Sequence, residues 1–189
     1  MGTEEIFKIS NVKDVDLAIL PTEGAKDLAK MVDKYLVEWY NEAAEKNNLP
    51  KKETFLINSK CPRFTTGDGK GIINDSVRGK DLFFICDVGN YNIEYTMFGT
   101  PNRMSPDDHY CDLKRLICAN AGKARRMTVV MPILYGGRQH RRNSRESLDC
   151  AQMLKELESM GVTDIITFDA HDPRVQNAVP EMGFDNFFA

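Results

Sequence analysis

Short hydrophobic runs alternate with amphipathic stretches along most of this chain. The run from Leu17 to Leu20 is typical of a buried strand, and after Pro21-Thr22 apolar residues recur at helical spacing from Leu28 to Ala43. The same alternation continues toward the end of the sequence. The ranges expected to form strands are 17–20, 54–58, 81–86, 127–131 and 165–168, and those expected to form helices are 28–43, 105–121 and 147–160.

This order of elements predicts an α/β fold. Strands separated by helices are joined by right-handed crossovers, so we expect a mostly parallel sheet with helices on both faces. The segment from Asp81 to Cys86 is apolar on both faces and is expected at the sheet centre. Ser105 and Pro106 supply a helix N-cap and an N1 proline, while Gly122 and Gly161 end two helices.

A small hairpin arm is expected before the central strands. Glycines at alternate positions from Gly67 to Gly71 mark a tight reversal that leads into Ile72-Ile73. This stretch lacks the G-x-x-x-x-G-K-[ST] spacing of a phosphate-binding P-loop, and no helix pattern follows it. The segment from Tyr91 to Met104 is expected to be irregular.

Composition narrows the possible classes of protein. With 189 residues and 42% hydrophobic content, we expect one domain spanning residues 1–189. The net charge of -3 gives no global attraction for nucleic acid or anionic lipid. Five cysteines without a C-x-x-C pair argue against disulfides and structural zinc. Neither a signal peptide nor a membrane span is recognisable, so we expect a cytoplasmic protein with no membrane or nucleic-acid partner.

Arginines are concentrated in the loop that follows the fourth predicted strand. Tyr135 to Arg145 contains four of them and no acid. Paired glycines, Gly136 and Gly137, allow close approach of the backbone to a ligand, and guanidinium groups match phosphate oxygens. The next helix would direct its positive N-terminus to the same place. A solvated basic loop is an equally good interpretation of the composition alone, whereas a nucleic-acid patch would need interleaved aromatics.

The segment Asp169-Ala170-His171 follows the last predicted strand. Residues two apart on a strand share a face, so the carboxylate and the imidazole are expected to project together. Asp169 suits Mg²⁺, and His171 suits a phosphate oxygen or a metal-bound water. A simple turn built by Asp169 and Asp172-Pro173 is the alternative. Because carboxyl ends of parallel strands lie at one edge of a sheet, this segment and the arginine loop could share one ligand.

Three separate segments together resemble the ribose-phosphate diphosphokinases, also called phosphoribosyl pyrophosphate synthetases. They are Ser76 to Asp81, Pro132 to Glu146 and Ile165 to His171, and the similarity extends over about Phe55 to Ala189. The resemblance implies a phosphoribosyltransferase-like fold. It also implies attack of the anomeric hydroxyl of ribose 5-phosphate on the β-phosphorus of Mg²⁺-ATP, with release of AMP.

The resemblance assigns roles to particular residues. The expected ATP-binding residues are Arg138, Gln139, His140, Arg142, Arg145, Phe64, Thr66 and Asp68. The expected Mg²⁺ site comprises Asp169, His171 and, as a weaker candidate, Asp185, with His171 also catalytic. In related enzymes the loop that matches Phe64 to Asp68 reaches into a neighbouring subunit, so a homo-oligomer is implied.

The chain departs from the family pattern in ways that affect its activity. The family's F-S-D-G-E loop reads Phe64-Thr65-Thr66-Gly67-Asp68, and the acid after R-Q is His140. The acid-acid…T-G-G-T loop that grips ribose 5-phosphate in the family's second half does not occur in these 189 residues. We therefore expect the ATP-side half of a synthetase, inactive alone. The alternative is a non-catalytic nucleotide-binding subunit that regulates or contacts other proteins.

Overall fold

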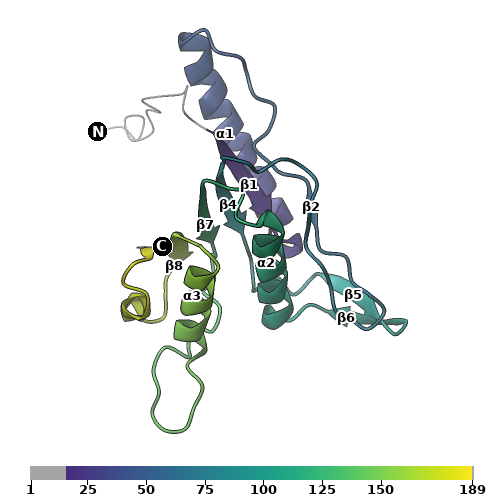
Figure 1. Cartoon of the computed structure of the whole chain (residues 1–189), viewed down its shortest axis with the longest axis vertical. Helices are drawn as coiled ribbons and strands as arrows, with labels where there is room; N and C mark the ends of the chain where they lie inside the picture. Colours follow the sequence, from purple (N-terminus) through teal and green to yellow (C-terminus); the bar gives the residue numbers. More distant parts are fainter. Residues whose placement is uncertain (1–15, 189) are drawn as a thin grey trace.

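The computed structural model describes residues 16–188, and they form an α/β fold around a five-stranded parallel sheet (Figure 1). The sheet order is β1-β4-β7-β8-β9. Its strands are β1 (Leu17–Pro21), β4 (Asp81–Ile85), β7 (Arg126–Val130), β8 (Asp164–Phe168) and β9 (Gly183–Phe187). The helices are α1 (Lys26–Lys46), α2 (Pro106–Asn120) and α3 (Asp149–Ser159), with 3-10 helices η3 (Glu23–Ala25) and η4 (Pro173–Ala178).

Helices cover both faces of this sheet, as the sequence predicts. Leu20 and Phe84 belong to a core that includes residues of α2 and α3. Their strand neighbours Ile19 and Ile85 point to the opposite face and pack with α1. This alternation follows from the two-residue period of a strand. β4 is an interior strand, whereas β7 occupies the middle of the five.

Helix α2 begins where the sequence signals place it. The Ser105 side chain accepts a hydrogen bond from the Asp108 backbone N–H, and the Asp108 side chain accepts one from Ser105, which completes a capping box. Ala121, in a left-handed conformation with φ 49°, ends the helix, and Gly122 follows with φ 68°. These contacts satisfy backbone groups at both ends of α2, because a helix cannot bond them internally.

Segment 54–58 is not the strand that the sequence predicts. Leu56 forms a single parallel bridge with Ile19. The backbone N–H of Phe55 donates instead to the Asp33 carboxylate of α1, over 2.7 Å. The Asp33 carboxylate therefore takes the place of the strand carbonyl that would accept this hydrogen bond in a longer ladder.

Two further elements are absent from the predictions. Residues 91–104, expected to be irregular, contain the antiparallel pair β5 (Glu94–Met97) and β6 (Thr100–Arg103). Phe98 and Gly99 have φ values of 48° and 81°, the positive values that tight hairpin turns require. β9 adds a fifth strand beside β8, although its sequence, GFDNF, is short and begins with glycine.

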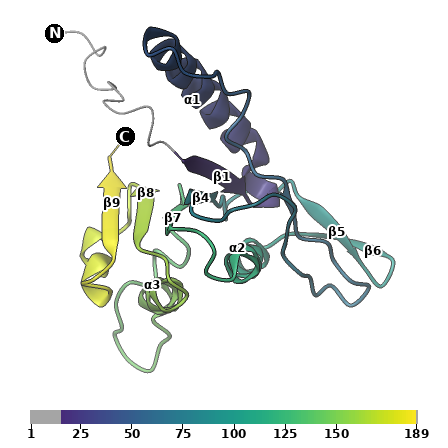
Figure 2. The same cartoon turned by 45° about the horizontal axis from the view of Figure 1, so that its top comes forward.

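The predicted hairpin arm is present and lies beside β5–β6. It contains β2 (Ser59–Lys60) and β3 (Ile72–Ile73). The backbone N–H of Phe98 donates to the Thr65 carbonyl over 2.8 Å, so the two hairpins touch near their tips. Figure 2 shows both hairpins on the opposite side of the molecule from β8 and β9.

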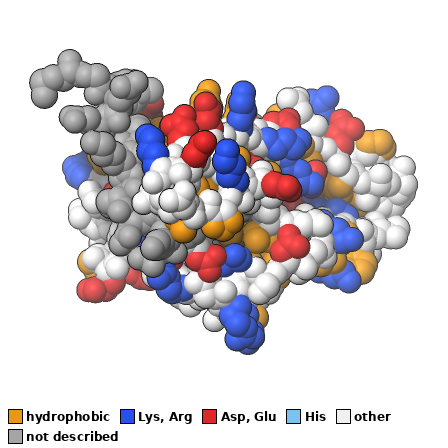
Figure 3. All heavy atoms as spheres, turned by 90° about the horizontal axis from the view of Figure 1, so that it is seen from above, with side chains coloured by type: hydrophobic (Ala, Val, Ile, Leu, Met, Phe, Trp, Pro, Cys, Tyr) orange, Lys and Arg blue, Asp and Glu red, His pale blue; other side chains and the backbone are white. Residues whose placement is uncertain are grey.

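The distribution of charged side chains on the surface agrees with the small net charge of -3. Basic and acidic side chains are interspersed over the face in Figure 3, which carries no extended area of one sign. Within residues 16–188, no helix is both long and apolar enough to cross a membrane.

Candidate functional site

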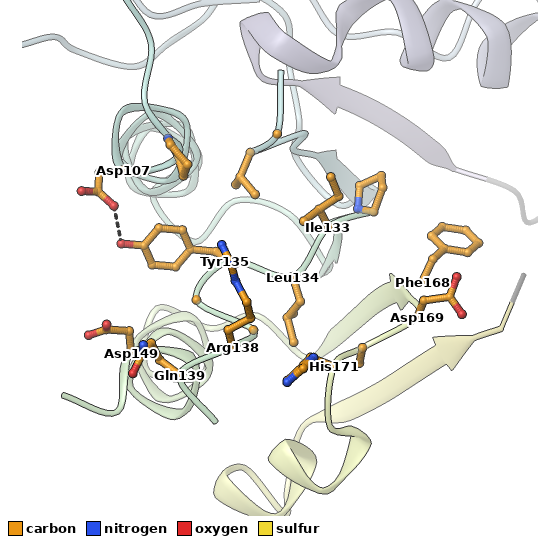
Figure 4. Close-up of a pocket in the computed structure, with 17 residues that line it drawn as sticks. Asp107, Ile133, Leu134, Tyr135, Arg138, Gln139, Asp149, Phe168, Asp169 and His171 are labelled. Carbon is orange, nitrogen blue, oxygen red and sulfur yellow. Dashed lines mark hydrogen bonds between the residues drawn. The ribbon is translucent and has the colours of Figure 1, made fainter. Parts of the chain in front are cut away.

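A cavity of about 710 Å³ lies at the carboxyl edge of the sheet (Figure 4). Segments that follow β4, β7 and β8 form its walls, together with the first turns of α2 and α3. This is the position where parallel α/β sheets usually bind ligands. The lining residues are Val88, Gly89, Pro106, Asp107, Pro132, Ile133, Leu134, Tyr135, Gly136, Gly137, Arg138, Gln139, Asp149, Phe168, Asp169, Ala170 and His171.

The loop after β7 turns tightly where it enters the cavity. Gly136 has a φ of 65°, and a Cβ atom there would lie 3.1 Å from the Cys150 backbone nitrogen at the start of α3. The Gln139 backbone N–H donates to the Gly136 carbonyl over 2.7 Å. The positive φ favours glycine here, and the tight space allows only a small residue. The turn brings Arg138 and Gln139 into the cavity wall, beside the N-terminus of α3.

Tyr135 anchors the beginning of this loop. Its ring stacks on the ring of Tyr110 from α2, with centroids 4.6 Å apart and an interplanar angle of 15°. Its hydroxyl donates to Asp107 over 2.7 Å, and this hydrogen bond raises the pKa of Tyr135 to about 12. Tyr110 in turn donates to Glu156 of α3 over 2.7 Å. The loop is thus attached to α2 and, through Tyr110, to α3.

The segment after β8 forms the other wall. Asp169 has a φ of 45°, in the left-handed region, so the strand ends at Phe168. The strand alternation expected for Asp169 and His171 therefore does not continue. Both residues line the cavity, but in Figure 4 the Asp169 carboxylate points away from the His171 imidazole. A non-glycine residue held in this conformation at a cavity stores backbone strain, which is common at functional sites.

His140, which belongs to the arginine loop, packs against His171. Their ring centroids are 5.1 Å apart, and His140 Nε2 lies 3.5 Å from the Asp172 carboxylate. The Arg174 side chain and backbone N–H donate hydrogen bonds to Asp172 and hold its pKa well below the usual range. His140 Nδ1 is buried and has no hydrogen-bond partner within residues 16–188. The contacts of His140 with His171 and Asp172 thus join the loop after β7 to the segment after β8.

The structure gathers only part of the predicted site. Arg138, Gln139, Asp169 and His171 line the cavity. Arg142 and Arg145 lie on the exposed part of the loop, between Gln139 and the start of α3 in the sequence. They are not among the lining residues, so the four arginines do not converge on one point.

Asp185 and the hairpin residues lie elsewhere. Asp185 is in β9, where it pairs in register with Ile166, and it is absent from the cavity wall. Phe64, Thr66 and Asp68 lie at the tip of the β2–β3 hairpin, where the Thr66 hydroxyl donates to the Asp68 carboxylate. These three side chains do not contribute to the cavity of their own chain.

Sequence reasoning missed several residues of the wall. Asp107, Tyr135 and Asp149 all line the cavity, and two of them are acids. Asp107 and Asp149 occupy the first turns of α2 and α3, where acids are read as helix-start signals. The first turns of α2 and α3 lie at the carboxyl edge of the sheet, and this position is the signal that would have identified Asp107 and Asp149 as cavity residues.

The side chains of the cavity fit a magnesium ion, which keeps water and phosphate ligands, better than a metal held by protein ligands alone. Within residues 16–188, no group of three or more His, Cys, Asp and Glu side chains is arranged to hold a metal. Mg²⁺ is usually held by one or two carboxylates, with water and substrate phosphates as the remaining ligands. Asp169 is an exposed carboxylate in the wall of a cavity of about 710 Å³, so the lining fits this mode of binding.

Comparison with known proteins identifies the family. A profile for the N-terminal domain of ribose phosphate pyrophosphokinase matches residues 17–161. The chain belongs to the ribose-phosphate pyrophosphokinase family. This confirms the resemblance drawn from the three sequence segments.

Individual proteins that resemble this chain are also ribose-phosphate pyrophosphokinases. Ribose-phosphate pyrophosphokinase 3 of Saccharomyces cerevisiae is 31% identical over 174 residues, which cover 90% of this chain and 47% of that protein. Ribose-phosphate pyrophosphokinase 1 of Candida albicans is 30% identical over 138 residues, covering 71% of this chain and 38% of its own. The chain thus spans less than half the length of these relatives.

A solved structure supports the fold. The phosphoribosylpyrophosphate synthetase of Mycobacterium smegmatis superposes with a TM-score of 0.65 at 16% sequence identity, and the match covers 92% of this chain and 49% of that one. The phosphoribosyltransferase-like α/β fold predicted from the sequence is therefore confirmed.

Proposed function

We propose that this chain is the ATP-side half of a ribose-phosphate pyrophosphokinase and that its cavity binds Mg²⁺-ATP. The observation that carries the proposal is the single cavity shared by the Gly136–Gln139 turn and the Asp169–His171 segment. These segments are separated in sequence but follow neighbouring parallel strands, β7 and β8. The cavity wall therefore combines a guanidinium, an imidazole and a carboxylate, which suits a polyphosphate with its cation.

Each side chain has a role in this proposal. The Arg138 guanidinium donates hydrogen bonds to phosphate oxygens, and Gln139 contacts the nucleotide. Asp169 holds Mg²⁺, and His171 donates to a phosphate oxygen or to a water on the cation. Mg²⁺ supplies neutralisation of phosphate charge when it is bound. The residues mainly position and stabilise charge, which is how most phosphoryl-transfer sites act.

The proposed reaction transfers diphosphate from ATP to ribose 5-phosphate. The anomeric hydroxyl oxygen forms a bond to the β-phosphorus and its proton passes to solvent, while the bond from that phosphorus to the oxygen bridging to the α-phosphorus breaks and AMP leaves with that oxygen. The chain lacks the family motif that grips ribose 5-phosphate, so this half binds ATP without turnover.

A neighbouring copy is part of the proposal. Phe64, Thr66 and Asp68 do not line the cavity of their own chain, and the arm that carries them lies across the molecule from β8 and β9 (Figure 2). If they contact adenine, as the family resemblance implies, they do so in the cavity of a second chain. The functional unit is then a homo-oligomer.

Calorimetric titration of the purified chain with ATP tests this function. We expect binding with Mg²⁺, weaker binding when Mg²⁺ is chelated, and a loss of about tenfold or more in Arg138→Ala, since a hydrogen bond to a charged group contributes about 1.5–3 kcal/mol. Arg126→Ala, at the opposite end of β7, is the matched control and should bind normally. Absence of binding with Mg²⁺, or equal loss in both variants, refutes the assignment.

A second assay separates a catalytic from a non-catalytic role. Ribose 5-phosphate-dependent AMP release is measured with the chain alone. We expect none, while ATP binding persists. AMP release that disappears in Arg138→Ala would show that this chain is a complete enzyme and would contradict the assignment to one half.

The alternative function is a nucleotide-binding regulatory subunit. It is favoured by His140, which stands in place of the family acid and contacts His171 and Asp172 instead of entering the cavity wall. If the intact polypeptide in its source cells has a mass of 21.4 kDa, this alternative is preferred. A mass about twice as large supports the synthetase.

A further inference from the structure

A buried histidine of α2 holds the loop after β4 from behind. His109 is 0% exposed, and its Nε2 atom lies 2.8 Å from the Asn90 carbonyl oxygen. A carbonyl oxygen only accepts hydrogen bonds, so Nε2 carries the hydrogen, and in the neutral ring Nδ1 is then an acceptor. Within residues 16–188, this buried Nδ1 has no hydrogen-bond partner. The ring thus makes one directed hydrogen bond, to the backbone of Asn90.

Asn90 is fixed from a second side as well. Its side-chain amide donates to the Gly24 carbonyl of η3 over 2.7 Å. Gly24 also packs against the histidine ring, since a Cβ atom on this glycine would lie 2.7 Å from His109 Cε1. The three residues therefore form a closed triangle of contacts, which joins α2, the loop after β4 and η3.

The residue before Asn90 forms part of the wall of the candidate site. Gly89 lines the cavity. Its backbone packs closely against Ile133, another lining residue, because a Cβ atom on Gly89 would lie 2.7 Å from Ile133 Cδ1. A shift of Asn90 would therefore move Gly89 and change the space available to the Ile133 side chain.

This part of the wall differs in chemistry from the part that we assign to the phosphates. Its residues carry no charged side chain, and they are Val88, Gly89, Pro132 and Ile133. Figure 4 shows Ile133 apart from Arg138 and His171, the residues proposed to donate to phosphate oxygens. An uncharged wall suits the nucleoside portion of a nucleotide better than its phosphates, because a buried charge without a partner is costly.

The hydrogen bond of His109 adds little to the stability of the fold. A hydrogen bond formed on folding contributes only a small net free energy, and a buried polar atom left unpaired costs a similar or larger amount. The bond made by Nε2 and the unpaired Nδ1 therefore nearly cancel, and an apolar side chain would avoid the unpaired nitrogen. What the histidine contributes is the position that it gives to Asn90.

We propose that His109 is a positioning residue for the nucleoside portion of the bound nucleotide. It acts through Asn90, which holds Gly89 and the adjoining Ile133 side chain in the cavity wall. His109 itself does not line the cavity. The inference rests on the proposed function, since it requires that the cavity take a nucleotide, and it adds which part of the wall meets the uncharged portion of that ligand.

Calorimetric titration of the full chain with Mg²⁺-ATP and with Mg²⁺-tripolyphosphate tests the proposal. We expect His109→Leu to bind ATP about fivefold more weakly, as the loss of one hydrogen bond predicts, and to bind tripolyphosphate as the wild type does. His109→Gln keeps an N–H donor close to the position of Nε2 and should restore ATP affinity. Asn120→Ala, which truncates a buried polar side chain at the other end of α2, is the matched control and should change neither affinity.

Two further measurements follow the path from His109 to the cavity wall. Without ligand, NMR should show a changed amide shift and a lower order parameter at Gly89 in His109→Leu, and wild-type values in His109→Gln. Asn90→Ala removes the hydrogen bond to Gly24 and should weaken ATP binding to a similar extent. Because both residues act through the same backbone segment, the effects of Asn90→Ala and His109→Leu should not add. Circular dichroism confirms that each variant is folded, and Asn90→Ala decides if His109→Leu is not.

The outcomes separate this inference from the proposed function. If the wild type binds neither ATP nor tripolyphosphate, the proposed function fails and the positioning role fails with it. If the wild type binds both ligands, the positioning role alone is overturned by any of three results. These are wild-type ATP affinity in folded His109→Leu or in Asn90→Ala, an equal loss of both ligands in these variants, and a His109→Gln variant that does not recover ATP affinity.

Discussion

Removing the Asp112 carboxylate should detach the hairpin arm from α2 and destabilise the whole domain. Asp112 is 2% exposed at its side chain, and the side chain of Arg63, in the arm just before its tip, is 8% exposed. Arg63 donates two hydrogen bonds to this carboxylate, of 2.7 and 3.0 Å. The same guanidinium lies 5.0 Å from the ring centroid of Tyr95 in β5. One buried ion pair thus holds both hairpins.

The size of the effect follows from burial. In Asp112→Ala the Arg63 guanidinium stays buried without its counter-charge, and breaking a buried pair in this way costs about 3–5 kcal/mol. Arg115 also donates to Asp112, over 2.7 Å, but its side chain is 27% exposed. Arg115→Ala leaves the buried pair intact, so its loss should be about 1 kcal/mol or less.

Urea unfolding and thermal unfolding, both monitored by circular dichroism, measure these differences in free energy and in Tm. For a domain of this size, 1 kcal/mol corresponds to about 2–4 °C in Tm, so Asp112→Ala should lower Tm by roughly 6–20 °C. A double variant, Arg63→Met with Asp112→Leu, removes both charges and should lose much less than Asp112→Ala. A loss below about 1 kcal/mol in Asp112→Ala would refute the reasoning, as would a double variant no more stable than the single one.

Three further predictions concern local packing and thiol chemistry. Gly71→Ala places a Cβ against the Arg115 carbonyl and should cost about 1–3 kcal/mol in urea unfolding; a neutral effect would contradict this. Ser105→Ala removes the α2 capping box and should cost about 1 kcal/mol, compared with less than about 0.5 kcal/mol for the exposed control Ser144→Ala. Burial raises the pKa of Cys86 to about 12 and of Cys150 to about 11, so both stay protonated up to pH 9. Mass-spectrometric alkylation mapping should find exposed Cys118 modified first; early labelling of Cys86 would contradict this.

The sheet was largely predictable because its interior strands are apolar on both faces. Asp81 to Ile85 and Arg126 to Val130 lie between two strands, so their sequences carry the signal. Strands at the edge of the sheet and in the hairpins carry a weaker apolar signal. β9 has one neighbour and exposes alternate residues, and β5–β6 depends on contacts with the other hairpin, so neither shows a strong apolar pattern.

The location of the candidate site was predictable from topology, but its details were not. Loops after β7 and β8 had to meet because parallel strands end at the same edge of the sheet. The left-handed conformation of Asp169 reverses the expected side-chain direction, and no residue pattern indicates it. The stacking of Tyr135 on Tyr110 joins residues from different elements, and such tertiary contacts are not visible in local sequence.

The central claim is that Mg²⁺-ATP occupies the cavity between the Gly136–Gln139 turn and the Asp169–His171 segment. Amide chemical-shift mapping of the full chain by NMR, during titration with Mg²⁺-ATP, tests it most directly. The account predicts saturable shifts at Gly136, Gly137, Arg138 and Ala170, with Lys155 on α3 unaffected. Saturable shifts confined to other surfaces, or no shifts in these residues, would contradict it.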